Sequence, residues 1–249
     1  MKKLILLLLV FVSLPTFARS FDVEVIIFKR NVEPSKINEA WPQDLAPINF
    51  DRAFSYRDSN MMSQHRASLL PSGYYRLNNQ YQALDRHAGF KPLVHVTWRQ
   101  NDRGESTSPV LHIQAGQDFS ERFAPDGRSL KELAADGTPL SIEKSPLYEL
   151  DGTIQVYVQH YLYLKTNLDL RVPGKNEVVL KDSVIAPSDD NEDENAEVQV
   201  GNLEPIKPKV EVQDFLNSYR MQQKRQIRSG EIHYLDNPLL GVIIRIDKA

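Results

Sequence analysis

Tyrosines recur on one side of the most regular alternating pattern in the sequence. Within Thr153–Arg171 the even positions are mostly apolar, while the odd positions carry Tyr157, Tyr161 and Tyr163 among polar residues. Alternate residues of a strand share one face, so we expect these rings on a common face. Aromatic rings stack on the apolar faces of sugars, and their hydroxyls bond to sugar oxygens. Rings that pair across strands produce the same pattern, so a sugar site and a structural role both stay open.

A basic segment follows later in the chain. Arg220, Lys224, Arg225 and Arg228 lie within Asn217–Arg228, whose periodicity fits a strand or a helix, and we favour the strand. Guanidinium and ammonium groups bind carboxylates, such as those of a cell-wall peptide or an acidic partner. A solvated strand face has the same composition, and the sequence does not separate these two interpretations.

One motif of nucleophilic catalysis occurs without its partners. Ser141-Ile142-Glu143-Lys144 matches S-x-x-K, in which the lysine lies one helical turn from a nucleophilic serine. No S-D-N accompanies it, and Lys165-Thr166-Asn167 is not K-T-G. Pro139 and Pro146 flank the motif and disfavour a helix there. We therefore predict no catalytic residues and treat the chain as a non-enzyme, with a cell-wall hydrolase or a serine acyl-transfer enzyme as the alternative.

Metal and cofactor motifs are missing from the sequence. The six histidines form no H-E-x-x-H or other short metal spacing, although Glu231 and His233 would share one strand face. There is no P-loop, Rossmann fingerprint or G-x-S-x-G, and there is no cysteine. We predict neither a metal nor a cofactor. The net charge of −3 gives no sign of a nucleic-acid binder.

The first eighteen residues have the pattern of a secretory signal peptide. Lys2 and Lys3 precede the apolar run Leu4–Leu14, whose eleven residues fall short of the ~20 that a membrane helix needs. Thr16 and Ala18 place small residues before the expected cleavage after Ala18. Export without cysteine suits the periplasm of a Gram-negative bacterium. We expect a soluble mature protein with no membrane insertion after cleavage.

Alternating and helical patterns predict the elements that position these residues. Phe21–Arg30 is apolar on both faces and predicts a central strand. Ser72 is the expected N-cap of a helix over Tyr74–His87, with Leu77, Tyr81 and Leu84 as its apolar stripe. Next in the chain we expect the strand Leu93–Trp98 with Val110–Ile113 as its hairpin partner, and a short helix over Arg128–Ala135. A turn at Asp151-Gly152 should precede one bent strand over Thr153–Arg171, with His160 in the core. A returning strand over Glu177–Ile185 and strands over Asn217–Arg228 and Leu240–Ile246 complete the expected elements.

The domain organisation follows from these elements. Residues 19–249 are expected to form a single α+β domain, with a mixed, mostly antiparallel β-sheet, one main helix, and the first and last strands near each other. Asp189–Glu197 holds six acids and no base, and prolines flank it. Such a segment buries too little apolar surface to order itself, so we expect an acidic mobile loop at about 187–208. A protein-only envelope scaffold that uses this loop is a further alternative.

The two ends of the chain resemble the CsiV family of periplasmic proteins. The resemblance lies in the segment 21–30, FDVEVIIFKR, and in the segment 225–241, RQIRSGEIHYLDNPLLG, where Asn237 stands in place of a more usual histidine. The resemblance implies a non-enzymatic protein that binds peptidoglycan. It also implies a functional partnership with the outer-membrane lipoprotein LpoA, which activates a class A penicillin-binding protein. No catalytic residue or cofactor carries over.

The second of these segments also predicts local structure. Gly230 and Asp236-Asn237-Pro238 have turn chemistry and would connect a strand ending near Arg228 to one beginning near Leu240. Such a connection would gather Arg228, Glu231, His233 and Tyr234 at one hairpin end. This cluster is either a ligand site or a polar network that fixes the turn. With Arg225 and the three tyrosines, it completes the set of candidate binding residues.

Overall fold

The computed structural model describes residues 19–37, 41–42, 45–135, 137, 145–179 and 210–249. The expected signal peptide, the S-x-x-K motif at 141–144 and the acidic loop at about 187–208 lie outside these residues. The chain divides into two compact units. The first comprises residues 1–119, 146–172 and 218–249, and the second comprises residues 120–145 and 173–217.

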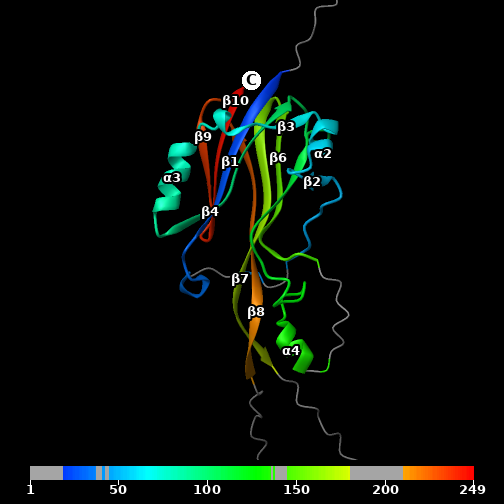
Figure 1. The fold of residues 1–249 in the computed structure, drawn as a ribbon, viewed down its shortest axis with the longest axis vertical. Coiled ribbons are helices and arrows are strands. Elements are labelled where there is room, and N and C mark those ends of the chain that lie inside the picture. Colours follow the sequence, from blue (N-terminus) through cyan, green and yellow to red (C-terminus); the bar gives the residue numbers. More distant parts are fainter. Residues whose placement is uncertain (1–18, 38–40, 43–44, 136, 138–144, 180–209) are drawn as a thin grey trace, which may run out of the picture. The chain divides into compact units, whose positions relative to one another are not determined.

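Sheet A of the first unit brings the two ends of the chain together. Its strand order is β3-β4-β1-β10-β9, and all neighbours are antiparallel. The central strand β1 lies between β4 and the last strand β10, as predicted (Figure 1). The strand bounds are β1 Ser20–Arg30, β3 Ala67–Leu69, β4 Phe90–Asn101, β9 Ile232–Asp236 and β10 Leu240–Lys248.

Sheet B has the order β2-β5-β6-β7-β8. The strands are β2 Ala53–Ser55, β5 Val110–Asp118, β6 Tyr148–Gln159, β7 Tyr161–Val179 and β8 Val210–Ile227. The predicted hairpin between Leu93–Trp98 and Val110–Ile113 is wrong, because β5 pairs with β6 and β2 in the other sheet. The predicted strand over Asn217–Arg228 is confirmed as the later part of β8.

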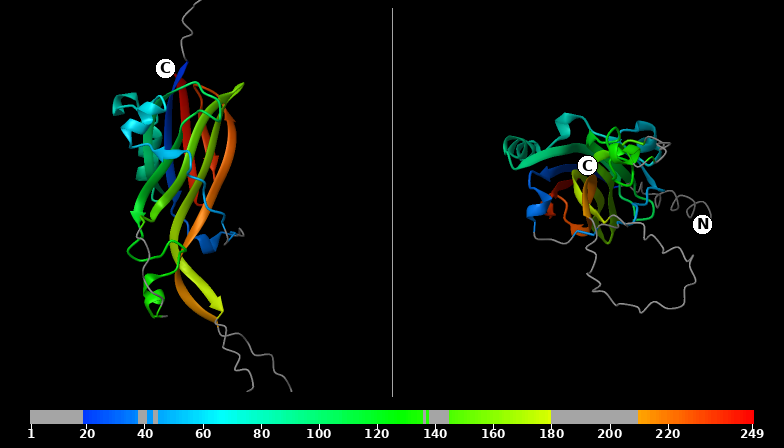
Figure 2. Two further views of the ribbon diagram at one scale, coloured as in Figure 1. Left: turned by 90° about the vertical axis from the view of Figure 1, so that its right-hand side faces the viewer. Right: turned by 90° about the horizontal axis from the view of Figure 1, so that it is seen from below.

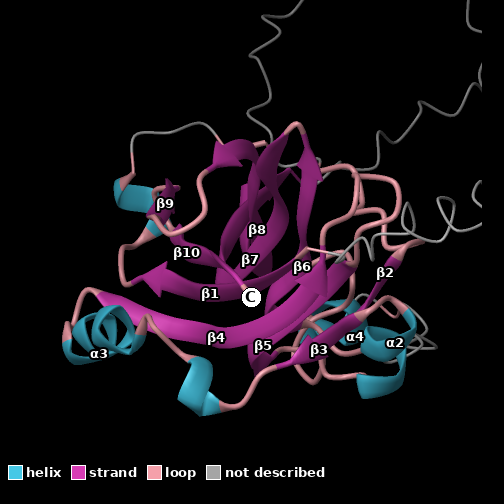
Figure 3. Ribbon diagram, turned by 90° about the horizontal axis from the view of Figure 1, so that it is seen from above, coloured by secondary structure: helices cyan, strands magenta, loops and turns pink. Residues whose placement is uncertain are grey.

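The apolar faces of the two sheets form one core in the first unit. Val23, Val25 and Ile27 of β1 belong to the same buried cluster as Ile154 and Leu164 of sheet B. The sheets therefore pack face to face as a sandwich (Figures 2 and 3). The opposite face of β1 also carries apolar groups, which a separate cluster around α3 covers.

The main helix begins later than the sequence predicts. α3 spans Asn78–Arg86, and its N-cap is Leu77 rather than Ser72, which opens a 3-10 turn at Ser72–Tyr74. The backbone N–H groups of Arg76 and Leu77 donate to the carboxylate of Glu24 on β1. A side chain distant in sequence therefore takes the place of a local cap. Two further short helices are α2 Ser59–Gln64 and the 3-10 turn Pro34–Lys36.

The alternating segment Thr153–Arg171 is a hairpin and not one bent strand. β6 and β7 meet at His160, which has φ 61° and is exposed, so its predicted place in the core is wrong. The hairpin pairs residues of equal parity, such as Tyr157 with Tyr163 and Val156 with Leu164. The even positions therefore still share the apolar face, which is why the pattern looked continuous.

The predicted turn at Asp151-Gly152 lies inside a strand. Asp151 and Gly152 belong to β6, where a Cβ on Gly152 would lie 2.2 Å from the Asn167 carbonyl oxygen of β7. This glycine permits a close backbone approach and does not form a turn. β7 continues through Pro173 and Gly174 to Val179, so the predicted returning strand at Glu177–Ile185 is wrong for its first three residues, which belong to β7 itself. Its remaining residues lie outside the described residues.

The second unit contains the short helix α4, Leu130–Ala135, and the distal ends of β7 and β8. The helix confirms the prediction for Arg128–Ala135. Leu133 and Leu216 are buried, and the Leu216 N–H donates to the carbonyl of Gly127 at 2.8 Å. Gly127 has φ 90° and lies under the ring of Phe215, so a side chain there would collide.

Candidate functional site

The C-terminal motif forms the connection from β8 to β9. Gly230 turns the chain with φ 85°. The Arg228 N–H donates to Nε2 of His233 at 3.0 Å, and Nε2 of Gln223 donates to the Asp236 carbonyl at 2.8 Å. These two contacts show that the end of β8 runs beside β9. The strand β9 itself was missed by the sequence analysis, which expected a plain turn here, and His233 serves the polar network that fixes it.

Tyr234 on β9 is exposed and firmly positioned. Its hydroxyl donates to Oδ1 of Asp236 at 2.7 Å and accepts from Nη2 of Arg30 at 2.7 Å. Arg30 also reaches Oδ1 of Asp236 at 2.5 Å. Burial raises the pKa of the Tyr234 hydroxyl and the bond to Asp236 adds to this, while Arg30 opposes it. The hydroxyl is therefore neutral at physiological pH, and the residue as a whole is 49% exposed.

A second aromatic ring supports Tyr234. Phe28 of β1 lies nearly parallel to it, with centroids 6.2 Å apart and an interplanar angle of 10°. A Cβ on Gly241 would lie 2.3 Å from Cζ of Phe28, so only glycine leaves room for this ring. Phe90 forms an edge-to-face contact with Phe28, with ring centroids 5.3 Å apart. Gly241 of the motif thus allows Phe28 to lie where it supports Tyr234.

Two arginines of the motif are free to meet a ligand. Arg225 is exposed and lies between the two contacts that join β8 to β9. Arg228 has a side chain 79% exposed, and its ion pair with Glu231 is long, at 3.9 Å. An ion pair of this kind contributes little, so a ligand carboxylate can replace it. We define the β8–β9 surface as Arg30, Arg225, Arg228, Tyr234 and Asp236.

The three tyrosines of the β6–β7 hairpin differ in access. Tyr157 is fully buried, and Tyr163 lies nearly parallel to it at 5.4 Å, so cross-strand pairing describes these two rings. Tyr161 is 59% exposed. Tyr161 lies on β7 of sheet B and Tyr234 on β9 of sheet A, and the two rings make no contact with each other.

Arg220 is engaged within the protein. Its guanidinium forms two hydrogen bonds of 2.7 Å with Asp169 and also reaches the Ala46 carbonyl. The hydrogen bond to Asp169 raises the pKa of Arg220. This arginine therefore holds the loop after β1 against sheet B and does not belong to the β8–β9 surface.

Three residues of this region were not among the candidates predicted from the sequence: Phe28, Arg30 and Asp236. Strand parity could have found them. Phe28 and Arg30 occupy alternate positions of β1, and Asp236 lies two residues after Tyr234 on β9. The alternation of residues along a strand does not predict the strand order β1-β10-β9, in which β1 and β9 lie on either side of β10.

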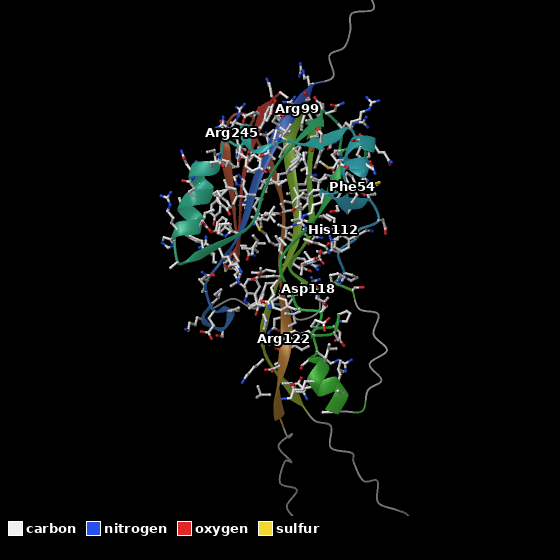
Figure 4. The ribbon with its side chains drawn as sticks, in the orientation of Figure 1. Phe54, Arg99, His112, Asp118, Arg122 and Arg245 are labelled. Atoms are coloured by element: carbon white, nitrogen blue, oxygen red, sulfur yellow. The ribbon has the colours of Figure 1, made fainter. Side chains whose placement is uncertain are left out.

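Among the described residues, no group of three or more His, Cys, Asp and Glu side chains could hold a metal ion. No helix in the same part of the chain is long and apolar enough to cross a membrane. Figure 4 shows the side chains, with Arg99 and Arg245 near one end of sheet A.

Comparison with known proteins gives one match. A family model described as "Peptidoglycan-binding protein, CsiV" matches residues 2–249, essentially the whole chain. No curated protein and no solved structure matches the sequence.

Proposed function

The chain belongs to the CsiV family of peptidoglycan-binding proteins, and from this we propose a periplasmic accessory protein that contacts peptidoglycan through the β8–β9 surface. In this proposal it supports wall assembly by a class A penicillin-binding protein that an LpoA-type outer-membrane lipoprotein activates. The expected signal peptide and the lack of cysteine support the periplasmic location.

The fixed, exposed ring of Tyr234 carries the proposal for the contact site. Sugar rings have apolar faces that stack on aromatic rings, and their hydroxyls need polar partners at the rim. Tyr234 presents such a ring, while Asp236 and Arg30 lie at its hydroxyl edge. Because Arg30 and Asp236 already fix the ring, little side-chain entropy is lost when a sugar binds.

The arginines supply the second kind of contact. Peptidoglycan carries carboxylates on its stem peptides, and the exposed guanidinium groups of Arg225 and Arg228 match them. Each contact is weak by itself because exposed charges are screened by salt. A sacculus repeats the same groups many times, so several weak contacts produce strong retention.

The test is co-sedimentation of residues 19–249 with purified sacculi. We expect Tyr234→Ala to lose most binding, and Tyr234→Phe to retain most of it because the ring remains. Tyr74→Ala is the matched control, since Tyr74 is 46% exposed and lies outside the β8–β9 surface. Equal pelleting of all three variants would remove Tyr234 from the proposal.

The partnership is tested separately with purified components. We expect the protein to raise glycan polymerisation by the class A synthase when the LpoA-type lipoprotein is present, and to have no effect on the synthase alone. Stimulation without the lipoprotein would assign a different partner, and no stimulation in either mixture would refute the accessory role.

A further inference from the structure

A carboxylate lies between two lysines on the outer face of sheet B. Glu105, in the loop between β4 and β5, contacts Nζ of Lys165 at 3.1 Å through Oε1. Its other oxygen lies 3.5 Å from Nζ of Lys224. Lys165 belongs to β7 and Lys224 to β8, so the neighbouring strands direct two ammonium groups to one point. Both lysine side chains are about half exposed, at 49% and 51%.

Aromatic rings position one of these lysines. Nζ of Lys224 lies 5.4 Å from the ring centroids of both Tyr157 and Tyr163. Such cation–π contacts favour a fixed ammonium over a freely rotating one. Tyr161 lies two residues before Tyr163 on the same face of β7 and is 59% exposed, so it extends the aromatic surface along the strand that carries Lys165.

The main chain of the Glu105 loop is anchored independently of its carboxylate. The buried side chain of Gln155 donates to the Glu105 carbonyl and to Oγ of Ser108, both at 2.7 Å. The Arg52 guanidinium bonds to the carbonyl of Ser106 at 2.6 Å. Rotation of the Glu105 side chain alone therefore frees both lysines, and the loop keeps its position.

The energetic cost of that rotation is small. The ion pairs of Glu105 are exposed and screened by water and salt, so each contributes little to stability. Removing the carboxylate from this place leaves two ammonium groups that pair with no other acid among the described residues, beside an aromatic surface. The site then has the chemistry to bind a ligand carboxylate in the same place.

We propose that Lys165 and Lys224 form a carboxylate-binding site that Glu105 occupies in the free protein. The ligand that suits it is the carboxylate end of a peptidoglycan stem peptide, whose aliphatic part would lie against Tyr161. This inference rests on the proposed function, and it adds a peptide-binding site on sheet B to the sugar contact on sheet A.

The experiment uses a fluorescent stem tetrapeptide with free carboxylates and measures its anisotropy with residues 19–249. Glu105→Gln should tighten binding by about fivefold, since it removes the internal carboxylate that competes for both lysines. The double variant Lys165→Gln/Lys224→Gln should weaken binding by about tenfold or more. The same peptide with all carboxylates amidated should not bind.

A neighbouring acid provides the control for long-range charge. Asp102→Asn removes the same charge from the same loop, at an exposed residue three positions away. An equal gain in Asp102→Asn and Glu105→Gln would overturn the competition by Glu105, and binding of the amidated peptide would overturn carboxylate recognition. Sacculus pelleting without peptide binding would refute this site alone, whereas failure to pellet would refute the proposed function.

Discussion

Glu24→Ala should be among the most destabilising substitutions in the first unit. The Glu24 carboxylate on β1 is only 4% exposed and accepts three hydrogen bonds. Two come from the N–H groups of Arg76 at 2.6 Å and Leu77 at 3.0 Å, and His95 lies 2.7 Å from Oε1. These bonds hold the start of α3 against sheet A.

The magnitude follows from what the substitution leaves behind. Each hydrogen bond to a charged acceptor is worth about 1.5–3 kcal/mol, and a buried donor without a partner adds a desolvation penalty. The substitution also removes the cost of burying the carboxylate, so the three contributions do not simply add. We expect a loss of about 3–5 kcal/mol in the free energy of unfolding, the range for breaking a buried charged network.

Asp22→Ala is the matched control on the same strand and the same face. Asp22 pairs with Arg99, whose side chain is 39% exposed, so its loss should cost about 1 kcal/mol or less. The assay is urea unfolding followed by the fluorescence of the buried Trp98. Equal, small losses in the two variants would refute the claim that Glu24 fixes α3.

Three further predictions concern pH, packing and salt. Burial raises the pKa of Asp151, but His112 and Arg171 outweigh it and lower that pKa overall. Wild type should therefore be more stable than Asp151→Asn at pH 7, and this difference should vanish as the pH falls below the ordinary aspartate pKa of 3.8. Urea unfolding at each pH measures the difference, and a difference in the free energy of unfolding that persists in acid would contradict this. Gly241→Ala should displace Phe28, cost about 1–3 kcal/mol and weaken sacculus binding, unlike Gly73→Ala, where a Cβ meets no atom within 4 Å. Arg225→Ala/Arg228→Ala should weaken sacculus binding more in low salt than in high salt, and unchanged binding would exclude both arginines.

Local patterns predict the strands that remain within one sheet. Phe21–Arg30 is apolar on both faces, and β1 is buried on one side by sheet B and on the other by the cluster under α3. Leu240–Ile246 pairs with it as the last strand. In both segments the position of the strand in the sheet determines which side chains are buried. The spacing of apolar residues is therefore enough to predict the strand.

The wrong predictions concern segments where contacts between residues far apart in the sequence override local conformational preferences. His160 adopts a left-handed turn although its neighbours continue the alternating pattern, because β6 and β7 pair tightly on both sides. Asp151-Gly152 is a common turn pair, yet the close approach of β7 keeps it within β6. Ser72 is a good N-cap residue, but Glu24 binds the backbone further along the chain.

The candidate site also combines residues that the sequence predicts with residues that only the strand order brings together. The motif residues Tyr234, Arg225 and Arg228 come from the sequence, while Arg30 and Phe28 reach Tyr234 only through the order of the strands. The buried position of Tyr157 depends on the loop around Glu105 and on Lys224, which no local pattern reveals.

Direct binding to the wall is decided by sedimentation of residues 19–249 with purified sacculi, together with a search for released muropeptides. We expect the protein to pellet with the sacculi and to release no muropeptide. Protein that stays in the supernatant with intact sacculi would contradict direct binding to the wall, and release of muropeptides would show an enzyme instead.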